Sequence, residues 1–191
     1  MNNCNIKDIK KLSMNFRSLA SRLIKSDPDD GIRNLKKLLN FIDSEHIIKD
    51  FIDSKNVNTY DVENDIRRLQ NSQSEYIIPE KKDEEICYVY QLLSCIAENC
   101  EFYYHPISFA YGYKQQEQVD SFNHRVVLPF INYITAFLDE VLIDLEEDAK
   151  RNAYIINANS SQINIADNKS NIDAAQNITN QTNDVEIIMQ T

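Results

Sequence analysis

The sequence predicts an all-α protein, a bundle of five to seven helices, and three observations support this. The 191 residues include only two glycines and four prolines, whereas sandwiches, barrels and glycine-cradled nucleotide sites need many more turn-forming residues. Apolar residues recur at helical three- and four-residue spacing in several long segments. The length suits one domain of about 150 residues with an appendage, which can bury a core without disulfides or a metal.

The first helix is marked by a single apolar stripe at alternating three- and four-residue spacing. The stripe consists of Ile9, Leu12, Phe16, Leu19 and Leu23. The helix should end near Ser26, because Pro28 disfavours helical geometry in the residue before it. The stretch Asp27-Pro28-Asp29-Asp30 also predicts the start of a second helix, since it offers a cap, a proline and acids for the positive helix end.

The same periodicity predicts the remaining helices. The second carries Ile32, Leu35, Leu39 and Ile42; a short third, capped by Ser44, carries Ile47, Ile48, Phe51 and Ile52; a weaker fourth carries Val62, Ile66 and Leu69. A fifth, with Ile86, Val89, Leu93, Ile96 and Cys100, should be central because further apolar residues widen its arc. The last spans about residues 121–150, and Pro129 should kink it or mark its start.

Two connecting segments lie between the predicted helices, and the second is rich in aromatic residues. The first, NSQSEYIIPEKKDEE, reads as a loop with a buried hook at residues 76–78. The second, EFYYHPISFAYGYK, covers residues 101–114 and has no clean helical or strand period. Because it contains Pro106 and Gly112, we expect a packed loop or a short helix there.

The chain is acidic, with 30 Asp and Glu against 20 Lys and Arg and a net charge of −10. Such a surface repels phosphate backbones, so no nucleic-acid binding is expected. Residues 1–26 are the exception, because they carry six cations against Asp8 alone, a local +5 that leaves −15 on the rest. The first helix either docks on its own acidic body, the favoured interpretation, or presents a basic face to a partner.

The four cysteines include no C-x-x-C pair. Cys95 and Cys100 would lie about 140° apart around a helix, so they cannot bind one ion from one helical face. Buried, reduced thiols are expected, and they predict a cytoplasmic location. The charged N-terminus does not resemble a secretory signal. The longest uncharged run, residues 126–138, is too short to span a bilayer, so no transmembrane segment is predicted.

No motif for catalysis, a cofactor or a metal is found, so no residue is predicted for these roles and a non-enzymatic protein is favoured. His46, His105 and His124 are best explained as surface, stacked and helix-start residues. Glu140, Asp144 and Asp148 share one helix face, but the Glu-x-x-His motif of di-iron bundles does not occur. We therefore interpret this row as a solvated acidic face.

The character of the chain changes after Arg151. Three nine-residue units follow: YIINANSSQ, INIADNKSN and IDAAQNITN. Alternating Ile-Asn-Ile favours short strands, whereas residues 170–173 have capping-box spacing that favours a helix. Two or three such units cannot bury their isoleucines alone. The tail is therefore predicted to be repeat-like and partly disordered or short-β, and an asparagine-rich linker is the alternative. The candidate interaction residues are Ile163, Ile165, Asn168, Ile172, Asn177 and Ile178.

Three blocks together resemble a family of uncharacterised bacterial helical proteins. The blocks are SLASRLIKSDPDDGIRNLKKLLNFIDSEHIIKDFI, FNHRVVLPFINYITAFLDEVLIDL and the tail segment QINIADNKSNIDAAQN, and the resemblance covers most of residues 16–180. It implies an accessory role in mobile elements or antiphage defence, and it brings no catalytic residues. The chain lacks the glycine that often precedes the family's tail, which puts a sharp turn into a strand near Ser161 in doubt.

The sequence thus predicts a helical bundle domain, residues 1–150, and a tail, residues 151–191. We interpret the protein as a non-enzymatic assembly protein that self-associates or binds a partner protein through the tail, without a cofactor. One alternative is an acidic regulator or inhibitor that covers a basic partner surface. A second is a small helical toxin or enzyme that uses the aromatic zone around His105 as a pocket. A third is a membrane role for the basic first helix.

Overall fold

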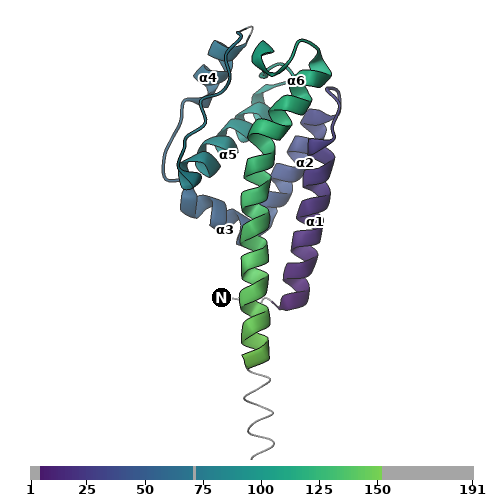
Figure 1. Cartoon of the computed structure of the whole chain (residues 1–191), viewed down its shortest axis with the longest axis vertical. Coiled ribbons are helices and arrows are strands. Elements are labelled where there is room, and N and C mark those ends of the chain that lie inside the picture. The colour runs from purple at the N-terminus through teal and green to yellow at the C-terminus, as the bar shows by residue number, and fades with distance from the viewer. Residues whose placement is uncertain (1–4, 71, 152–191) are drawn as a thin grey trace, which may run out of the picture. The chain divides into compact units, whose positions relative to one another are not determined.

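The computed structural model describes residues 5–70 and 72–151, and across both ranges it contains helices and no strands (Figure 1). The α-helices are α1 (Ile6–Ile24), α2 (Gly31–Ser44), α3 (His46–Lys55), α4 (Val62–Leu69), α5 (Lys82–Asn99) and α6 (Gln115–Phe122). A 3-10 helix, η1 (Phe109–Tyr111), precedes α6, and a π-helical turn, η2 (Asn123–Val127), follows it. Residues 128–151, here called the last helix, continue from the π turn, so Gln115–Arg151 is one helical segment. The predicted all-α class is confirmed.

The chain divides into two compact units, residues 1–142 and residues 143–191. The first contains α1 to α6 and the beginning of the last helix. Within the second, residues 143–151 are helical. The carboxylates of the predicted acidic row, Glu140 in the first unit and Asp144 and Asp148 in the second, are all exposed.

α1 buries the stripe that its periodicity predicts. Ile9, Phe16 and Leu23 are fully buried, and the helix packs on α2. The Asn5 side chain accepts a hydrogen bond from the Asp8 N–H at 3.0 Å, which satisfies one free donor of the first turn. α1 ends at Ile24, close to the predicted end.

The start of α2 and the cap of α3 differ from the prediction. α2 begins at Gly31, because the Asp27 carboxylate accepts the N–H groups of Asp29 (3.0 Å) and Asp30 (2.7 Å) and so closes a turn ahead of the helix. Ser44 is the last residue of α2, and its hydroxyl donates to the Phe41 carbonyl. The α3 N-cap is Glu45, without a side-chain capping bond.

α5 is the central helix, as predicted. It packs against α2, α3 and α4, and Figure 1 shows it lying beside α4. Its buried residues lie around much of its circumference, which a helix contacted on several sides requires. The last helix also contributes to this core, since the rings of Phe137 and Phe51 of α3 stack with centroids 4.1 Å apart.

The predicted hook at residues 76–78 is only partly correct. Tyr76 is 5% exposed, but Ile77 is 74% exposed and Ile78 is half-buried. A single aromatic side chain therefore anchors this loop.

The helix around Pro129 starts earlier than predicted, at Gln115 rather than near residue 121. Proline lacks an N–H and its ring clashes with the carbonyl one turn earlier. The π turn lies directly upstream, where the Leu128 N–H donates to the Asn123 carbonyl. The wider turn relieves this clash, and the helix passes through Pro129 without ending.

Candidate interaction surfaces

A hydrogen-bonded framework holds the aromatic zone in place. The Tyr76 hydroxyl donates to the Pro106 carbonyl at 2.6 Å, and the Tyr76 N–H donates to the Tyr111 hydroxyl at 3.2 Å. The Phe109 N–H donates to the Ser72 carbonyl at 3.0 Å. These bonds fasten the loop after α4 to the segment before α6, so the aromatic zone is fixed to the bundle from two sides.

Tyr103 and Asn123 join the aromatic zone to α1. The buried Tyr103 hydroxyl donates to Asn123 Oδ1 at 2.7 Å, and Asn123 Nδ2 donates to the Leu23 carbonyl at 3.0 Å. Both side chains are fully buried. The Tyr103 ring also covers Gly31, where an added Cβ would lie 2.3 Å from Tyr103 Cδ1. Only glycine at position 31 leaves room for this ring.

Above this framework lies a hollow of about 300 Å³, here called the aromatic hollow. Several aromatic rings around it face solvent: Tyr113 is 84% exposed and Phe109 is 45% exposed. The hollow lies at the start of α6, beside η1; α6 is labelled near the top of Figure 1. It is lined by Tyr104, His105, Ile107, Phe109, Tyr113, Gln115 and Gln118.

Gln118 is the polar group at the base of this hollow. It is only 5% exposed, and its side-chain amide forms no hydrogen bond with the described part of the chain. Every fully enclosed side-chain nitrogen or oxygen in residues 5–70 and 72–151 has a hydrogen-bond partner. The Gln118 amide must therefore reach the small open area of the hollow, with its donor and acceptor available there.

The lining of the hollow gives the toxin or enzyme hypothesis little support. His105 is exposed and contacts the edges of Phe102 and Tyr104, with ring centroids 5.0 and 4.9 Å away. No carboxylate, thiol or amine lines the hollow. A histidine acting as general acid or base usually needs such a partner to orient or activate it. The other two histidines, His46 and His124, are exposed on helices.

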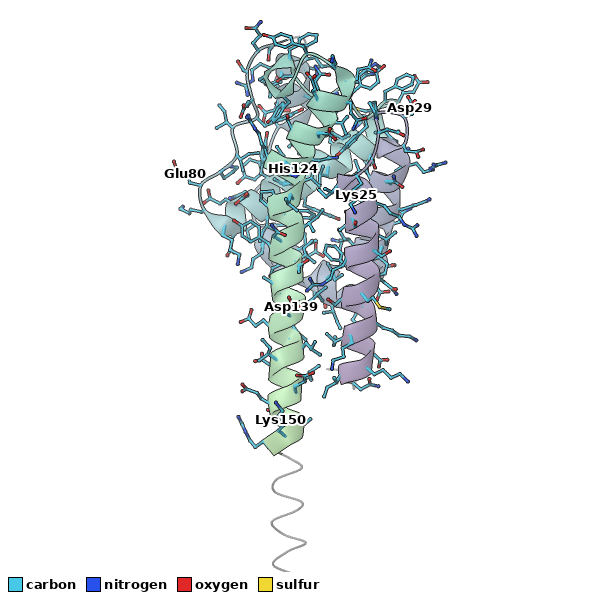
Figure 2. All side chains as sticks on the ribbon, turned by 45° about the vertical axis from the view of Figure 1, so that its right-hand side comes forward. Lys25, Asp29, Glu80, His124, Asp139 and Lys150 are labelled. Carbon is cyan, nitrogen blue, oxygen red and sulfur yellow. The ribbon has the colours of Figure 1, made fainter. Side chains whose placement is uncertain are left out.

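The cations of α1 are divided between two faces. Arg17 reaches the last helix, where its Nη2 lies 2.6 and 2.7 Å from the two carboxylate oxygens of Asp139. Lys7, Lys11, Arg22 and Lys25 are exposed and form no ion pair in the described ranges. Figure 2 shows Asp139 beside α1, and Lys25 at the end of α1. The favoured expectation that the first helix docks its charge internally is thus wrong for these four cations.

These four cations form one stripe, here called the basic stripe, together with Met14 and Ser18. The positions 7, 11, 14, 18, 22 and 25 follow helical spacing and cover about 80° of the helix circumference at about 100° per residue. Met14 is 64% exposed in the middle of the stripe. The stripe lies opposite the buried face of α1, so it is a continuous basic surface with an apolar centre.

A second surface, here called the α4–α5 furrow, has the opposite charge. Two hollows of about 370 and 230 Å³ lie between α4 and α5 and share Glu63, Cys95 and Asn99. The larger is lined by the carboxylates of Asp61, Glu63 and Glu98 and by no cation. Arg67 lines the smaller hollow and pairs with Glu63 at 3.3 Å, while Glu98 has no ion pair in the described ranges.

Gln91 of α5 holds one side of the furrow in place through hydrogen bonds. Its amide nitrogen donates to the Asn58 carbonyl at 2.6 Å and to Asn56 Oδ1 at 2.7 Å, and its oxygen accepts the Tyr60 N–H at 2.9 Å. These bonds hold the loop before α4 against α5. Asp61, which follows Tyr60, is thereby placed at the mouth of the furrow, where it also caps α4 through the Asn64 N–H.

The thiols in the described part of the chain are free. Cys87 and Cys95 are buried and Cys100 is half-buried; Cys4 lies outside the described residues. Burial raises the pKa of the Cys95 and Cys100 thiols, which lowers their thiolate fraction and their reactivity. The two line one hollow but no group of three metal-binding side chains forms in residues 5–70 and 72–151.

The segment Gln115–Arg151 meets, by length and composition, the test for a membrane-crossing helix, with a mean hydropathy of 1.7 over its most apolar window. A third of that window is buried. The window includes Asp139, which is paired with Arg17, and Phe137, which stacks on Phe51. A core helix of a folded bundle passes the same test, and Phe137 lies in the core in this way.

The predicted tail residues Ile163, Ile165, Asn168, Ile172, Asn177 and Ile178 lie outside the described residues. Sequence reasoning missed Gln118 and the α4–α5 furrow, whereas a basic face of the first helix was its alternative interpretation. Comparison with protein-family models, curated proteins and solved structures found no match to the chain.

Proposed function

We propose that the protein is a non-enzymatic assembly protein whose copies associate by seating the basic stripe of one chain on the α4–α5 furrow of another. The observation that carries the proposal is the segregation of charge. Four cations without ion pairs lie on one face of α1, and three carboxylates line a hollow with no cation between α4 and α5. Opposite potentials on two surfaces of one chain favour contact between copies.

The net charge supports a second copy over an anionic ligand as the partner of the basic stripe. A nucleic acid or an anionic membrane would meet the basic stripe on a chain that carries −10 overall, and repulsion from the rest of the surface opposes such binding. A second copy presents only the carboxylates of its furrow to the stripe, and not the extended negative charge of a nucleic acid or a membrane. Met14, exposed at the centre of the stripe, supplies apolar area to the same contact.

The contact is expected to depend on salt and on the sign of the charges. In light scattering, the mass should exceed that of one chain at about 0.1 M salt, where the Debye length is about 10 Å, and fall towards a monomer at about 1 M. Lys11→Glu with Arg22→Glu, or Glu63→Lys with Glu98→Lys, should each give a monomer at low salt. Lys37→Glu with Lys150→Glu makes the same charge change as the first pair at other exposed positions and should leave the mass unchanged.

Mixing the two reversed variants provides the decisive arm. For this arm all four cations of the stripe, Lys7, Lys11, Arg22 and Lys25, are changed to glutamate, because reversing only two of them would leave the stripe without net charge. Such a chain has an acidic stripe and an acidic furrow, and the chain with Glu63→Lys and Glu98→Lys has a basic stripe and a furrow of net positive charge. Neither chain associates with itself, but the acidic stripe of the first matches the basic furrow of the second. An equimolar mixture should therefore recover the mass of the wild-type assembly. A wild-type chain that is monomeric at both salt concentrations, or a mixture that stays monomeric, contradicts the proposal.

The tail hypothesis makes a separate prediction. A chain ending at Arg151 should keep its helical content and its stability to urea, because the buried apolar residues of the described core lie between Ile9 and Leu138. Assembly through tail isoleucines would be hydrophobic and thus nearly insensitive to salt. If full-length protein stays assembled at about 1 M salt and the shortened chain is a monomer, the tail assembles. Equal masses for the two chains there exclude self-association through the tail.

A further inference from the structure

We propose that the aromatic hollow is a binding site for an uncharged, proline-rich peptide segment of a partner protein, held in the polyproline II conformation. This site is separate from the α4–α5 furrow and the basic stripe, and no step of the assembly described above uses it. Three features of the hollow carry the inference: its exposed rings, its unpaired buried amide and its lack of charge.

The exposed rings provide the apolar contact. Phe109 and Tyr113 line the hollow and are 45% and 84% exposed, and Phe102, beside His105, is 37% exposed. Aromatic rings exposed together are typical of sites where a few residues supply most of the binding energy. Their flat faces suit proline rings, and aromatic-lined grooves are the usual receptors for polyproline II segments.

Gln118 provides the polar recognition. A primary amide offers two donor hydrogens and one acceptor oxygen, and in a 5% exposed side chain these groups have little water to replace a partner. A polyproline II segment has no internal hydrogen bonds and presents its carbonyl groups outward. The Gln118 amide nitrogen can donate to one such carbonyl, and its oxygen can accept from the N–H of a neighbouring residue that is not proline.

The charge of the hollow selects against other ligands. Its lining contains no lysine, arginine, aspartate or glutamate, so a phosphate or carboxylate would find no counter-charge there. The nearest basic side chain along the chain, Lys114, pairs instead with Glu117 at 3.7 Å. A neutral peptide satisfies the rings and the amide without placing an unpaired charge against them.

The hollow is also preorganised for a ligand. The bonds from Tyr76 to Pro106 and Tyr111 fix its supporting segment, and the Tyr103–Asn123 bond fixes the start of that segment to the π turn. A preformed site loses little conformational entropy when a ligand binds, and a polyproline II peptide is itself restricted before binding. Both properties favour a short peptide as the occupant.

The test uses the full-length protein and a capped, uncharged peptide with proline at every second or third position. Binding is followed by calorimetry and by NMR shifts of the Gln118 side-chain amide. We expect saturable binding, and a peptide with glycine in place of proline should bind at least about tenfold more weakly. Gln118→Leu and Tyr113→Ala should each weaken binding by at least about tenfold.

Matched controls separate binding from folding. Gln116→Leu changes a glutamine on the same helix that does not line the hollow and should bind as the wild type does. Tyr113 is too exposed for its loss to affect folding, so Tyr113→Ala keeps the test decisive even if Gln118→Leu does not fold. The variants with reversed charge on the basic stripe should bind the peptide normally, which keeps this outcome independent of the assembly.

Three results would overturn the inference. They are the absence of saturable peptide binding, peptide binding that Tyr113→Ala leaves unchanged, and binding of adenosine at the Gln118 amide with no peptide binding. The last would assign the exposed rings and the amide to a nucleobase.

Discussion

Asn123→Leu is expected to lower the free energy of unfolding by about 2 kcal/mol, because it leaves the enclosed Tyr103 hydroxyl without its partner. The Leu23 carbonyl also loses a bond, but it still accepts the Ser26 N–H at 3.1 Å. Asn123 accepts from the Tyr103 hydroxyl at 2.7 Å and donates to the Leu23 carbonyl at 3.0 Å. Leucine has a similar shape but no polar atoms, so the loss is electrostatic more than steric. Each buried group left unsatisfied costs about 1–3 kcal/mol. Urea unfolding followed by circular dichroism measures the change.

A second substitution checks this reason for the loss. Tyr103→Phe added to Asn123→Leu removes the orphaned hydroxyl, so the double variant should recover part of the stability. His124→Gln, at the next and exposed position of the same π turn, should stay within about 0.5 kcal/mol of the wild type. If the Asn123→Leu variant also falls within that range, the hydrogen bonds from Asn123 to Tyr103 and Leu23 contribute nothing measurable to the free energy of unfolding.

Alkaline pH is expected to destabilise the protein steeply. Burial raises the pKa of the Tyr103 hydroxyl, and burial followed by nearby titratable groups raises the pKa of Tyr76. Unfolded tyrosines lose their protons near a pKa of about 10, whereas these two stay protonated in the folded protein. Their stabilising effect is therefore complete below pH 10 and declines above it, by about 1.4 kcal/mol per pH unit for each tyrosine.

The free energy of unfolding, measured in urea at several pH values from about 9 to 11, should fall above about pH 10 with a slope to which these two residues contribute about 3 kcal/mol per pH unit. Burial also raises the pKa of Tyr111, to about 12, which steepens the loss. Tyr103→Phe should reduce the slope by about 1.4 kcal/mol per pH unit. If the Tyr103→Phe variant shows the same slope as the wild type, Tyr103 does not contribute to the loss of stability at alkaline pH.

Most of the helices could be predicted from the sequence because the apolar spacing that defines each one lies within the helix itself. The stripe from Ile9 to Leu23 has a period that α1 reproduces, and α5 follows from the same rule. Helix boundaries were less predictable where side chains act on the backbone of a turn. Asp27 matches the pattern of a helix cap, but its carboxylate closes a turn before Gly31. The packing of Tyr103 on Gly31 could not be predicted either, because the two residues lie far apart in the sequence.

The candidate surfaces were less predictable because they depend on contacts distant in the sequence. The cluster of lysines and arginines before residue 26 indicated a basic helix, but only the Arg17–Asp139 pair, 122 residues apart, determines which face is neutralised. Gln118 has no local signal either, since its burial results from the segment before it folding over α6. The furrow likewise requires α4 and α5 to pack together, which periodicity alone does not determine.

The π turn at Asn123–Val127 has a consequence for how this chain tolerates changes in length. A π turn holds one residue more than the α-helical turn it replaces, so it acts as a one-residue insertion absorbed within a helix. Deleting one residue there would restore ordinary helical geometry and leave the residues after it nearly in phase, so Asp139 would stay beside Arg17 and Phe137 beside Phe51. The same deletion in the regular helix between the π turn and Phe137 would instead rotate both side chains by about 100° around the helix axis. The π turn is therefore the position in this helical segment where the chain can lose a residue and still keep the contacts that follow.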